Sequence, residues 1–200
     1  FDLDLAYESR IMKSFIDSYA EVCDIQFDNF RDKYPLFENK NQHIDEKLIV
    51  ICADGSGWEG KQWPIEKWKE VVFYLQSHEY NVVETGNYHT DLTDSKWHNC
   101  SLDQMVDIIS KCSLYIGADN GGSHVAQALD KKRIIICGAA LHSLTNPKRE
   151  FSLNIQNNLS ESLGIKHKQF FNVQGNGLTF VPFSEKDPTC GLKDIEVEHV

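Results

Sequence analysis

The stretch Leu114-Tyr-Ile-Gly-Ala-Asp-Asn-Gly-Gly-Ser-His-Val-Ala-Gln-Ala-Leu129 decides the fold of this chain. Its first residues, Leu114 to Ala118, form an apolar run that predicts a strand ending at Asp119, and a helical pattern begins near Ser123. Two glycines lie between the strand and the helix. Such a turn directs unpaired backbone N–H groups and the positive end of the helix dipole toward one point. We therefore predict an anion site at this turn, with phosphate as the expected anion.

The residues of the turn supply the predicted contacts. Gly121 and Gly122 let the backbone approach an anion closely, while Asp119 and His124 stand at the rim of the site. The alternative is a tight strand-to-helix turn in which His124 only caps a helix. The local sequence by itself leaves both interpretations open.

Apolar runs alternate with helical patterns from Lys47 onward, which predicts an α/β fold. The expected strands are Leu48–Cys52, Tyr80–Thr85, Trp97–Asn99, Leu114–Ala118 and Arg133–Cys137. Continuous apolar strands that are each followed by a helix indicate a Rossmann-like parallel sheet with helices on both faces. Ligands of such sheets bind beyond the carboxyl ends of the strands, and both Gly-rich turns of this chain fall there.

Two helices between these strands carry clear signals. The first begins at Pro64, which suits a first helical turn, and its apolar positions are Trp68, Val71, Val72 and Leu75. The second follows Ser101, the expected N-cap, with Gln104 as its capping-box partner. Its apolar face is expected to hold Leu102, Met105, Val106, Ile108 and Ile109.

The flanking segments divide the chain into residues 1–46 and 47–200. The first region is predicted to hold a helix over Leu5–Val22 and a connector over Phe27–Pro35. The second is the Rossmann-like domain with an irregular carboxyl-terminal extension. The chain begins with Phe1 rather than Met, so we expect it to be a piece of a longer protein.

The carboxyl-terminal extension holds two weaker signals. Gly175-Asn-Gly177 predicts a turn or hairpin between Phe171–Val173 and Leu178–Val181. Asp194 is expected to cap a helix that begins within Ile195–Val200.

Composition narrows the class of protein. The 200 residues carry a formal net charge of −10, which argues against nucleic-acid binding through a broad basic surface. The longest nearly apolar run, Ile134 to Leu141, is too short to span a bilayer, and no signal segment opens the chain. The six cysteines include no C-x-x-C pair, so we expect reduced thiols in a cytoplasmic protein. We expect no metal site and no cofactor.

A second turn lies within Gly55-Ser-Gly-Trp-Glu-Gly-Lys-Gln-Trp-Pro64. Lys61 precedes a helix there, and its ammonium group suits a phosphate oxygen, although a surface lysine is usually only solvated. We expect Trp63 and Trp68 to anchor the core rather than to stack on a ligand. The turn is not a P-loop, because Gln62 follows the lysine where a Mg²⁺-binding hydroxyl is required.

The two turns, in this order, resemble glycosyltransferase family 9, whose best-known members are bacterial heptosyltransferases that build the lipopolysaccharide core. The motif of the first turn is Lys61-Gln-Trp-Pro64, and that of the second is Asp119-Asn-Gly-Gly-Ser-His-Val-Ala-Gln-Ala128. Cys190-Gly-Leu-Lys-Asp-Ile195 also resembles the tail of the family. The resemblance implies one half of a GT-B fold, the carboxyl-terminal, donor-binding half, with residues 1–46 as the segment that joins the two domains.

The resemblance also implies roles for individual residues. Lys61 and the turn residues Asn120, Gly121, Gly122 and Ser123 would hold the diphosphate of a nucleotide-diphosphate sugar. The residues Asp119, His124, Ser56 and Gly57 would line the donor site. Fixed donors there would stabilise the negative charge that develops on the leaving diphosphate, and that arrangement needs no metal.

The chain departs from the family pattern at several points. Asn120 replaces the usual Ser or Thr, and the loop from Gly86 to Lys96 is shorter than in most members. A carboxylate that binds the ribose is expected near that loop, with Asp91 as the first candidate and Glu84 as the second. We assign no catalytic base, because the family carries it on an amino-terminal domain that this sequence does not include.

The leading hypothesis is therefore the donor-binding domain of a glycosyltransferase that moves a sugar, ADP-heptose-like, with inversion and without a metal. Its partners would be the nucleotide sugar, a glycan or lipid-linked glycan acceptor and an amino-terminal GT-B domain, with no nucleic acid and no transmembrane segment. Its place would be the cytoplasm, either free or at the periphery of the inner membrane. The alternatives are a non-catalytic nucleotide-binding or interaction module of a larger protein and a sugar-nucleotide epimerase on the same fold.

Overall fold

A computed structural model describes most of the predicted Rossmann-like domain. The residues described are 15–27, 37, 43–55, 59–87, 90–138, 152–156, 165–171, 178–184 and 192–200. Ser56 and Gly57, two of the residues expected to line the donor site, lie outside them, as do residues 5–14 of the predicted first helix. The described part of that helix is α2, Phe15–Val22.

Six parallel strands form one sheet in the order β3-β2-β1-β4-β5-β6. Their bounds are β1 Asp45–Cys52, β2 Asn81–Gly86, β3 Lys96–His98, β4 Cys112–Ala118, β5 Arg133–Cys137 and β6 Ser152–Gln156. All five predicted strands are present, and β5 has the predicted bounds. The prediction of an α/β, Rossmann-like fold with a parallel sheet is confirmed. Strand β6 was not predicted.

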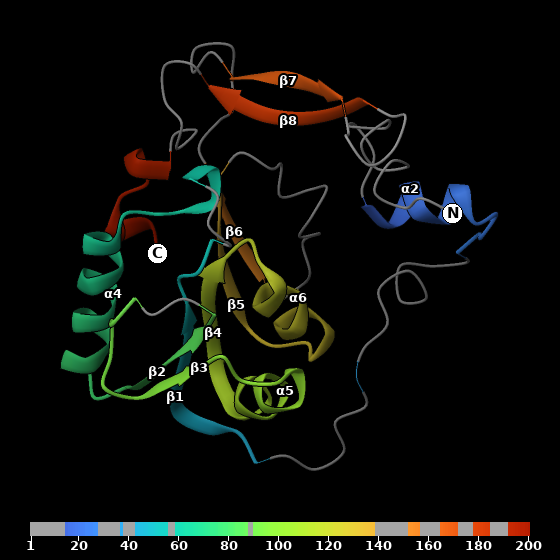
Figure 1. Cartoon of the computed structure of the whole chain (residues 1–200). Coiled ribbons are helices and arrows are strands. Elements are labelled where there is room, and N and C mark those ends of the chain that lie inside the picture. Colours follow the sequence, from blue (N-terminus) through green and yellow to red (C-terminus); the bar gives the residue numbers. More distant parts are fainter. Residues whose placement is uncertain are drawn as a thin grey trace.

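Helices cover both faces of this sheet, with α4 (Ile65–Ser77) on one side and α5 (Leu102–Lys111) and α6 (Gly121–Ala128) on the other (Figure 1). The alternation of side chains along β1 produces this arrangement. Ile49 and Ile51 join the core beneath α4, whereas Val50 and Cys52 join the core beneath α5 and α6. Each face is apolar because each is covered.

The predicted helix signals are confirmed in detail. Helix α4 follows Pro64 directly, and its buried residues are the four predicted ones, Trp68, Val71, Val72 and Leu75. Helix α5 begins with the predicted capping box between Ser101 and Gln104. The predicted apolar face of α5 is wrong at Leu102, which is 63% exposed because it lies in the first turn, before the helix reaches the sheet.

Helix α6 begins two residues earlier than predicted. Asn120 is its N-cap, with the side chain accepting a hydrogen bond from the Ser123 N–H, so Gly121 and Gly122 are the first two helical residues. The prediction placed them in the turn because glycine usually marks turns. The capping bond of Asn120 compensates for the low helix propensity of the two glycines.

The predicted helix over Ile195–Val200 is wrong. Two 3₁₀ turns stand there instead, η3 (Leu192–Asp194) and η4 (Val197–His199). The carbonyl of Ile195 accepts hydrogen bonds from Trp63 Nε1 at 3.1 Å and from Lys67 Nζ at 2.8 Å. These tertiary bonds use a backbone acceptor that an α-helix would need within its own first turn.

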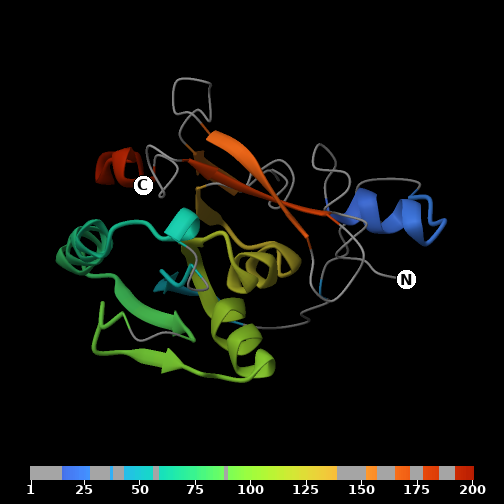
Figure 2. The same ribbon diagram turned by 45° about the horizontal axis from the view of Figure 1, so that its top comes forward.

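The predicted hairpin is present, but its first strand lies earlier than predicted and shares only Phe171 with the expected Phe171–Val173. β7 (Ile165–Phe171) pairs antiparallel with β8 (Leu178–Ser184), separate from the main sheet (Figures 1 and 2), while the residues of the turn itself lie outside the described ones. Among the described residues, no helix is long and apolar enough to cross a membrane. The division into residues 1–46 and 47–200 stays a prediction.

Candidate functional site

The two Gly-rich turns meet at the carboxyl edge of the sheet. Strands β1 and β4 are direct neighbours, with Cys52 paired to Gly117, so the segments that follow them leave the sheet side by side. Asn120 on the second segment donates from Nδ2 to the carbonyl of Asp54 on the first, at 2.7 Å. The two turns thus follow neighbouring strands, at the edge where open parallel sheets bind ligands, and the common crevice stays a prediction.

Lys61 reaches this edge from the short 3₁₀ turn η1, Glu59–Lys61. Its Nζ lies 2.8 Å from Oδ2 of Asp119, and the side chains of Lys61 and Asp119 are 22% and 2% exposed. A lysine this enclosed is not the solvated surface lysine of the alternative interpretation. The ion pair joins two residues that were predicted as site residues from two separate turns.

Two glycines let the backbone of η1 run this close to the sheet. A Cβ on Gly55 would lie 2.6 Å from the carbonyl oxygen of Lys61, and a Cβ on Gly138 would collide with the carbonyl oxygen of Gly60. Gly55 follows β1 and Gly138 follows β5, so the lysine turn is held over the carboxyl ends of the sheet from two sides.

The amino terminus of α6 faces open space at the same edge. A Cβ on Gly121 would have no atom within 4 Å, whereas Gly122 packs against the Tyr115 hydroxyl. Ser123 is fully buried, its hydroxyl donates to the Asn120 carbonyl at 2.7 Å, and its N–H donates to Asn120 Oδ1, so Gly121 and Gly122 form the part of the helix end that can meet an anion. Free N–H groups and the helix dipole at this point favour an anion.

His124 follows in the first turn of α6 and is exposed on one side. Its pKa is lowered, chiefly by desolvation, and further by the positive charges of Arg133 and Lys61, while the Asp119 carboxylate acts in the opposite direction. The imidazole is therefore predominantly neutral at pH 7, and its charge state depends on the same Lys61–Asp119 pair that forms the site.

NMR can test the direction in which the charges of Lys61 and Asp119 shift the pKa of His124. In the free protein, His124 should titrate below the ordinary value of about 6.5. Lys61→Ala should raise its pKa because a positive neighbour is removed, and Asp119→Asn should lower it because a negative one is removed. The imidazole C–H signals, assigned with His124→Gln, give the midpoints. A free-protein midpoint above 6.5, or shifts of the opposite sign, would contradict this electrostatic arrangement.

The structure places the two ribose candidates differently. Asp91 is mostly exposed and its carboxylate is ion-paired with Lys96 on the edge strand β3. Glu84 is 1% exposed and accepts hydrogen bonds from the Thr90 hydroxyl and from the Leu92 N–H, the latter at 3.0 Å. Glu84 therefore holds the following loop against β2. The role of Asp91 toward a ribose stays a prediction.

One carboxylate at this edge was missed by the sequence analysis. Asp54 lies just after β1, much as Asp119 lies just after β4. Asp54 is 9% exposed, and Oδ2 of Asp54 accepts a hydrogen bond from the Asn87 N–H. The signal was available, because an acidic residue directly after a buried strand lies at the ligand edge of the sheet. Its carboxylate ties the end of β2 to the end of β1.

The remaining predictions about side chains concern the core and the thiols. Trp63 and Trp68 are 3% and 1% exposed and pack edge to face at 5.1 Å, which confirms them as core anchors. The described cysteines are Cys23, Cys52, Cys100, Cys112 and Cys137, and all are free thiols. Burial raises the pKa of Cys52 to about 11, so this thiol beside the site is not a nucleophile.

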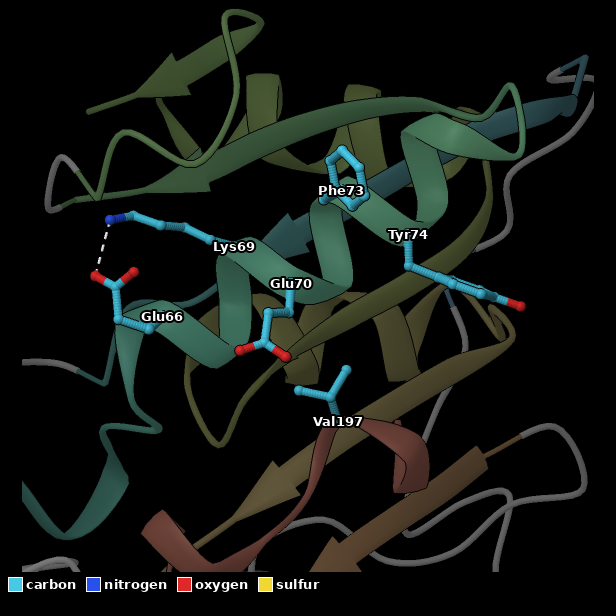
Figure 3. A pocket seen from close by; sticks show the side chains of 6 residues that line it. All are labelled: Glu66, Lys69, Glu70, Phe73, Tyr74 and Val197. Atoms are coloured by element: carbon cyan, nitrogen blue, oxygen red, sulfur yellow. Dashed lines mark hydrogen bonds and ion pairs between the residues drawn. The ribbon is translucent and has the colours of Figure 1, made fainter.

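A separate hollow lies on the outward side of α4 (Figure 3). It is lined by Glu66, Lys69, Glu70, Phe73, Tyr74 and Val197, with Lys69 turned toward Glu66 in an ion pair. None of the predicted site residues lines it. Within the described residues, no group of three or more His, Cys, Asp or Glu side chains is arranged to hold a metal ion.

The model of glycosyltransferase family 9 (heptosyltransferase) matches residues 6–95 and 98–171. No protein of curated function matches the chain significantly by sequence.

Solved structures share the fold at low identity. E. coli ADP-heptose LPS heptosyltransferase II has 20% identity and a TM-score of 0.52, over 76% of this chain and 44% of that chain. E. coli heptosyltransferase WaaC with ADP has 16% identity and a TM-score of 0.55, over 70% and 48%. The family 9 glycosyltransferase from Veillonella parvula has 16% identity and a TM-score of 0.54, over 74% and 50%. The chain thus spans about half the length of these structures.

Proposed function

Because the chain belongs to glycosyltransferase family 9 (heptosyltransferase), we propose that it binds the diphosphate of a nucleotide-diphosphate sugar at the carboxyl edge of its sheet. In this proposal it is the donor-binding half of a two-domain, GT-B type transferase. The observation that carries the proposal is the enclosed Lys61 ammonium beside the open amino terminus of α6. The ammonium can donate to a phosphate oxygen while it stays paired with Asp119, and the helix end adds a partial positive charge.

The chemistry of sugar transfer requires such a site. As the bond between the sugar and the diphosphate breaks, negative charge grows on the leaving diphosphate oxygen. Lys61 and the N–H groups of Gly121 and Gly122 would stabilise that charge in the transition state, and because they are already held in place they need no reorganisation. These groups supply the positive charge without a metal, so we propose metal-independent transfer, with inversion at the sugar.

The nucleotide and the acceptor are part of the same proposal. An ADP-heptose-like donor is supported by two proteins that share the fold, one an ADP-heptose heptosyltransferase and the other a heptosyltransferase solved with ADP. The acceptor would be a glycan or lipid-linked glycan, as in lipopolysaccharide biosynthesis. The base that deprotonates it would come from an amino-terminal GT-B domain. We propose a cytoplasmic place for the reaction, free or at the inner membrane.

Calorimetric titration with ADP, UDP and GDP tests the binding step. At least one of them should bind with a dissociation constant in the micromolar range, and the corresponding monophosphate should bind at least about tenfold more weakly because it lacks one phosphate–Lys61 contact. No binding of any of the three diphosphates would refute the proposal.

A transfer assay separates an enzyme from a binding module. Together with the proposed amino-terminal GT-B domain, the chain should release nucleoside diphosphate from the nucleotide sugar when an acceptor glycan is present. Binding without release would indicate a non-catalytic module, and an isomerised nucleotide sugar would indicate an epimerase.

A further inference from the structure

We propose that Asn120 is a positioning residue, which fixes Lys61 for diphosphate binding through the backbone of Asp54 and Gly55 without touching the ligand itself. The proposal rests on the proposed function, since it concerns the affinity of the same site. In this proposal the side chain of Asn120 holds the two Gly-rich turns in a fixed position relative to each other.

All hydrogen-bond donors and acceptors of the Asn120 side-chain amide have partners within the protein. Its Nδ2 donates to the Asp54 carbonyl at 2.7 Å and to Cys52, whose Sγ lies at 3.2 Å and whose carbonyl oxygen lies at 3.5 Å. Its Oδ1 accepts from the Tyr115 hydroxyl and from the Ser123 N–H, each at 3.2 Å. Two donors and two acceptor positions are all that a primary amide offers. No capacity is left for a direct ligand contact.

These partners also fix which way the amide points. The Ser123 N–H can only donate and the Asp54 carbonyl can only accept, so exchanging the amide oxygen and nitrogen would break both bonds. Aspartate would cap α6 but could not donate to Asp54. Serine or threonine would cap α6 as well, but with a single short hydroxyl in place of two N–H donors. Among residues of this size, only asparagine makes all four bonds.

The contact continues from Asp54 to Lys61. Asp54 is followed by Gly55, whose backbone lies so close to the Lys61 carbonyl that a Cβ would stand 2.6 Å from it. A shift of the Asp54 carbonyl away from Asn120 therefore moves Gly55 against the turn that carries Lys61. On the other side that turn rests on Gly138, so it cannot move freely in compensation. Asn120 acts on the lysine through this series of backbone contacts.

The test is a double-mutant cycle on the affinity of the full chain for ADP, or for UDP or GDP if one of these is the diphosphate that binds. Asn120→Ser keeps the helix cap but removes the donor to Asp54, and it should weaken binding about tenfold. Lys61→Ala should cost about a hundredfold in the wild-type background but only about tenfold in the Asn120→Ser background, because the lysine is already displaced there.

Two further variants separate a direct effect on affinity from a general loss of stability. Ser101→Ala removes the N-cap of α5, whose cap bonds involve neither of the two turns; it should lower the melting temperature about as much as Asn120→Ser but leave the affinity unchanged. In Gly55→Ala the added Cβ clashes with the Lys61 carbonyl while Asn120 is unchanged. This variant should also bind the diphosphate more weakly, and its loss should be non-additive with that of Lys61→Ala. If Asn120→Ser does not fold, Asn120→Asp takes its place, because aspartate keeps the acceptor for the Ser123 N–H and loses only the donor to Asp54.

The outcomes are distinct. A non-additive loss for Asn120→Ser with Lys61→Ala supports the positioning role of Asn120, and the same result for Gly55→Ala supports the backbone route to Lys61. Wild-type affinity in Asn120→Ser, or losses that simply add to that of Lys61→Ala, overturn it and leave the proposed function intact. If the wild-type chain binds none of the three diphosphates, the proposed function fails first and this inference fails with it.

Discussion

Lys61→Ala should weaken the binding of a nucleoside diphosphate about a hundredfold, the largest functional effect that we expect from a single substitution. The change removes the ammonium group at the mouth of the site. It also leaves the Asp119 carboxylate, 2% exposed, without the lysine that lies 2.8 Å away. The negative charge of Asp119 then acts directly against the incoming diphosphate, in surroundings where water screens it poorly.

Calorimetry or fluorescence titration measures this loss, and the chain offers a matched control. Lys69→Ala removes the same charge from α4, where the lysine is half exposed and paired with Glu66, and it should leave the affinity unchanged. The double variant Lys61→Ala with Asp119→Asn should recover part of the loss, because the repulsive carboxylate is gone. Equal effects of Lys61→Ala and Lys69→Ala would mean that the affinity depends on net charge and not on this site.

Trp68→Ala should lower the free energy of unfolding by about 3–5 kcal/mol, the largest effect on stability that we expect. Trp68 is 1% exposed and packs in the core between α4 and the sheet, with Trp63 against its ring. Trp63 in turn donates to the Ile195 carbonyl, so this pair also holds the carboxyl-terminal turns. Truncation leaves a cavity at the point where three parts of the chain meet. A loss of this size is a large share of the 5–15 kcal/mol that stabilises a typical domain.

Urea unfolding followed by circular dichroism measures the change without relying on tryptophan emission. Trp97→Ala is the control, since this tryptophan is 38% exposed on the edge strand and should cost no more than about 1 kcal/mol. Trp68→Phe should cost less than Trp68→Ala because it fills most of the same space. Its indole N–H has no hydrogen-bond partner among the described residues, so phenylalanine gives up no such bond. Similar losses for Trp68→Ala and Trp97→Ala would contradict this account of the core.

Much of the fold could be read from short-range patterns. The five predicted strands, the buried face of α4 and the capping box of α5 depend on residues only a few positions apart, where apolar periodicity and cap chemistry act directly. The errors lie where distant parts of the chain decide. The carboxyl-terminal residues do not form the predicted helix, because Trp63 and Lys67 take the Ile195 carbonyl. Leu102 is exposed although its spacing suited the buried face.

In the candidate site, too, some features could be predicted from local sequence and others depend on contacts between distant residues. The parallel α/β sheet, the two Gly-rich turns at its carboxyl edge and the residue types that suit a phosphate could all be predicted, because they follow from local pattern and from a fixed rule of sheet topology. The pairing of Lys61 with Asp119 and the bonds of Asn120 that join both turns are visible only in the folded protein. Those contacts depend on β1 and β4 lying side by side and on the close backbone packing at Gly55 and Gly138, which no local pattern encodes.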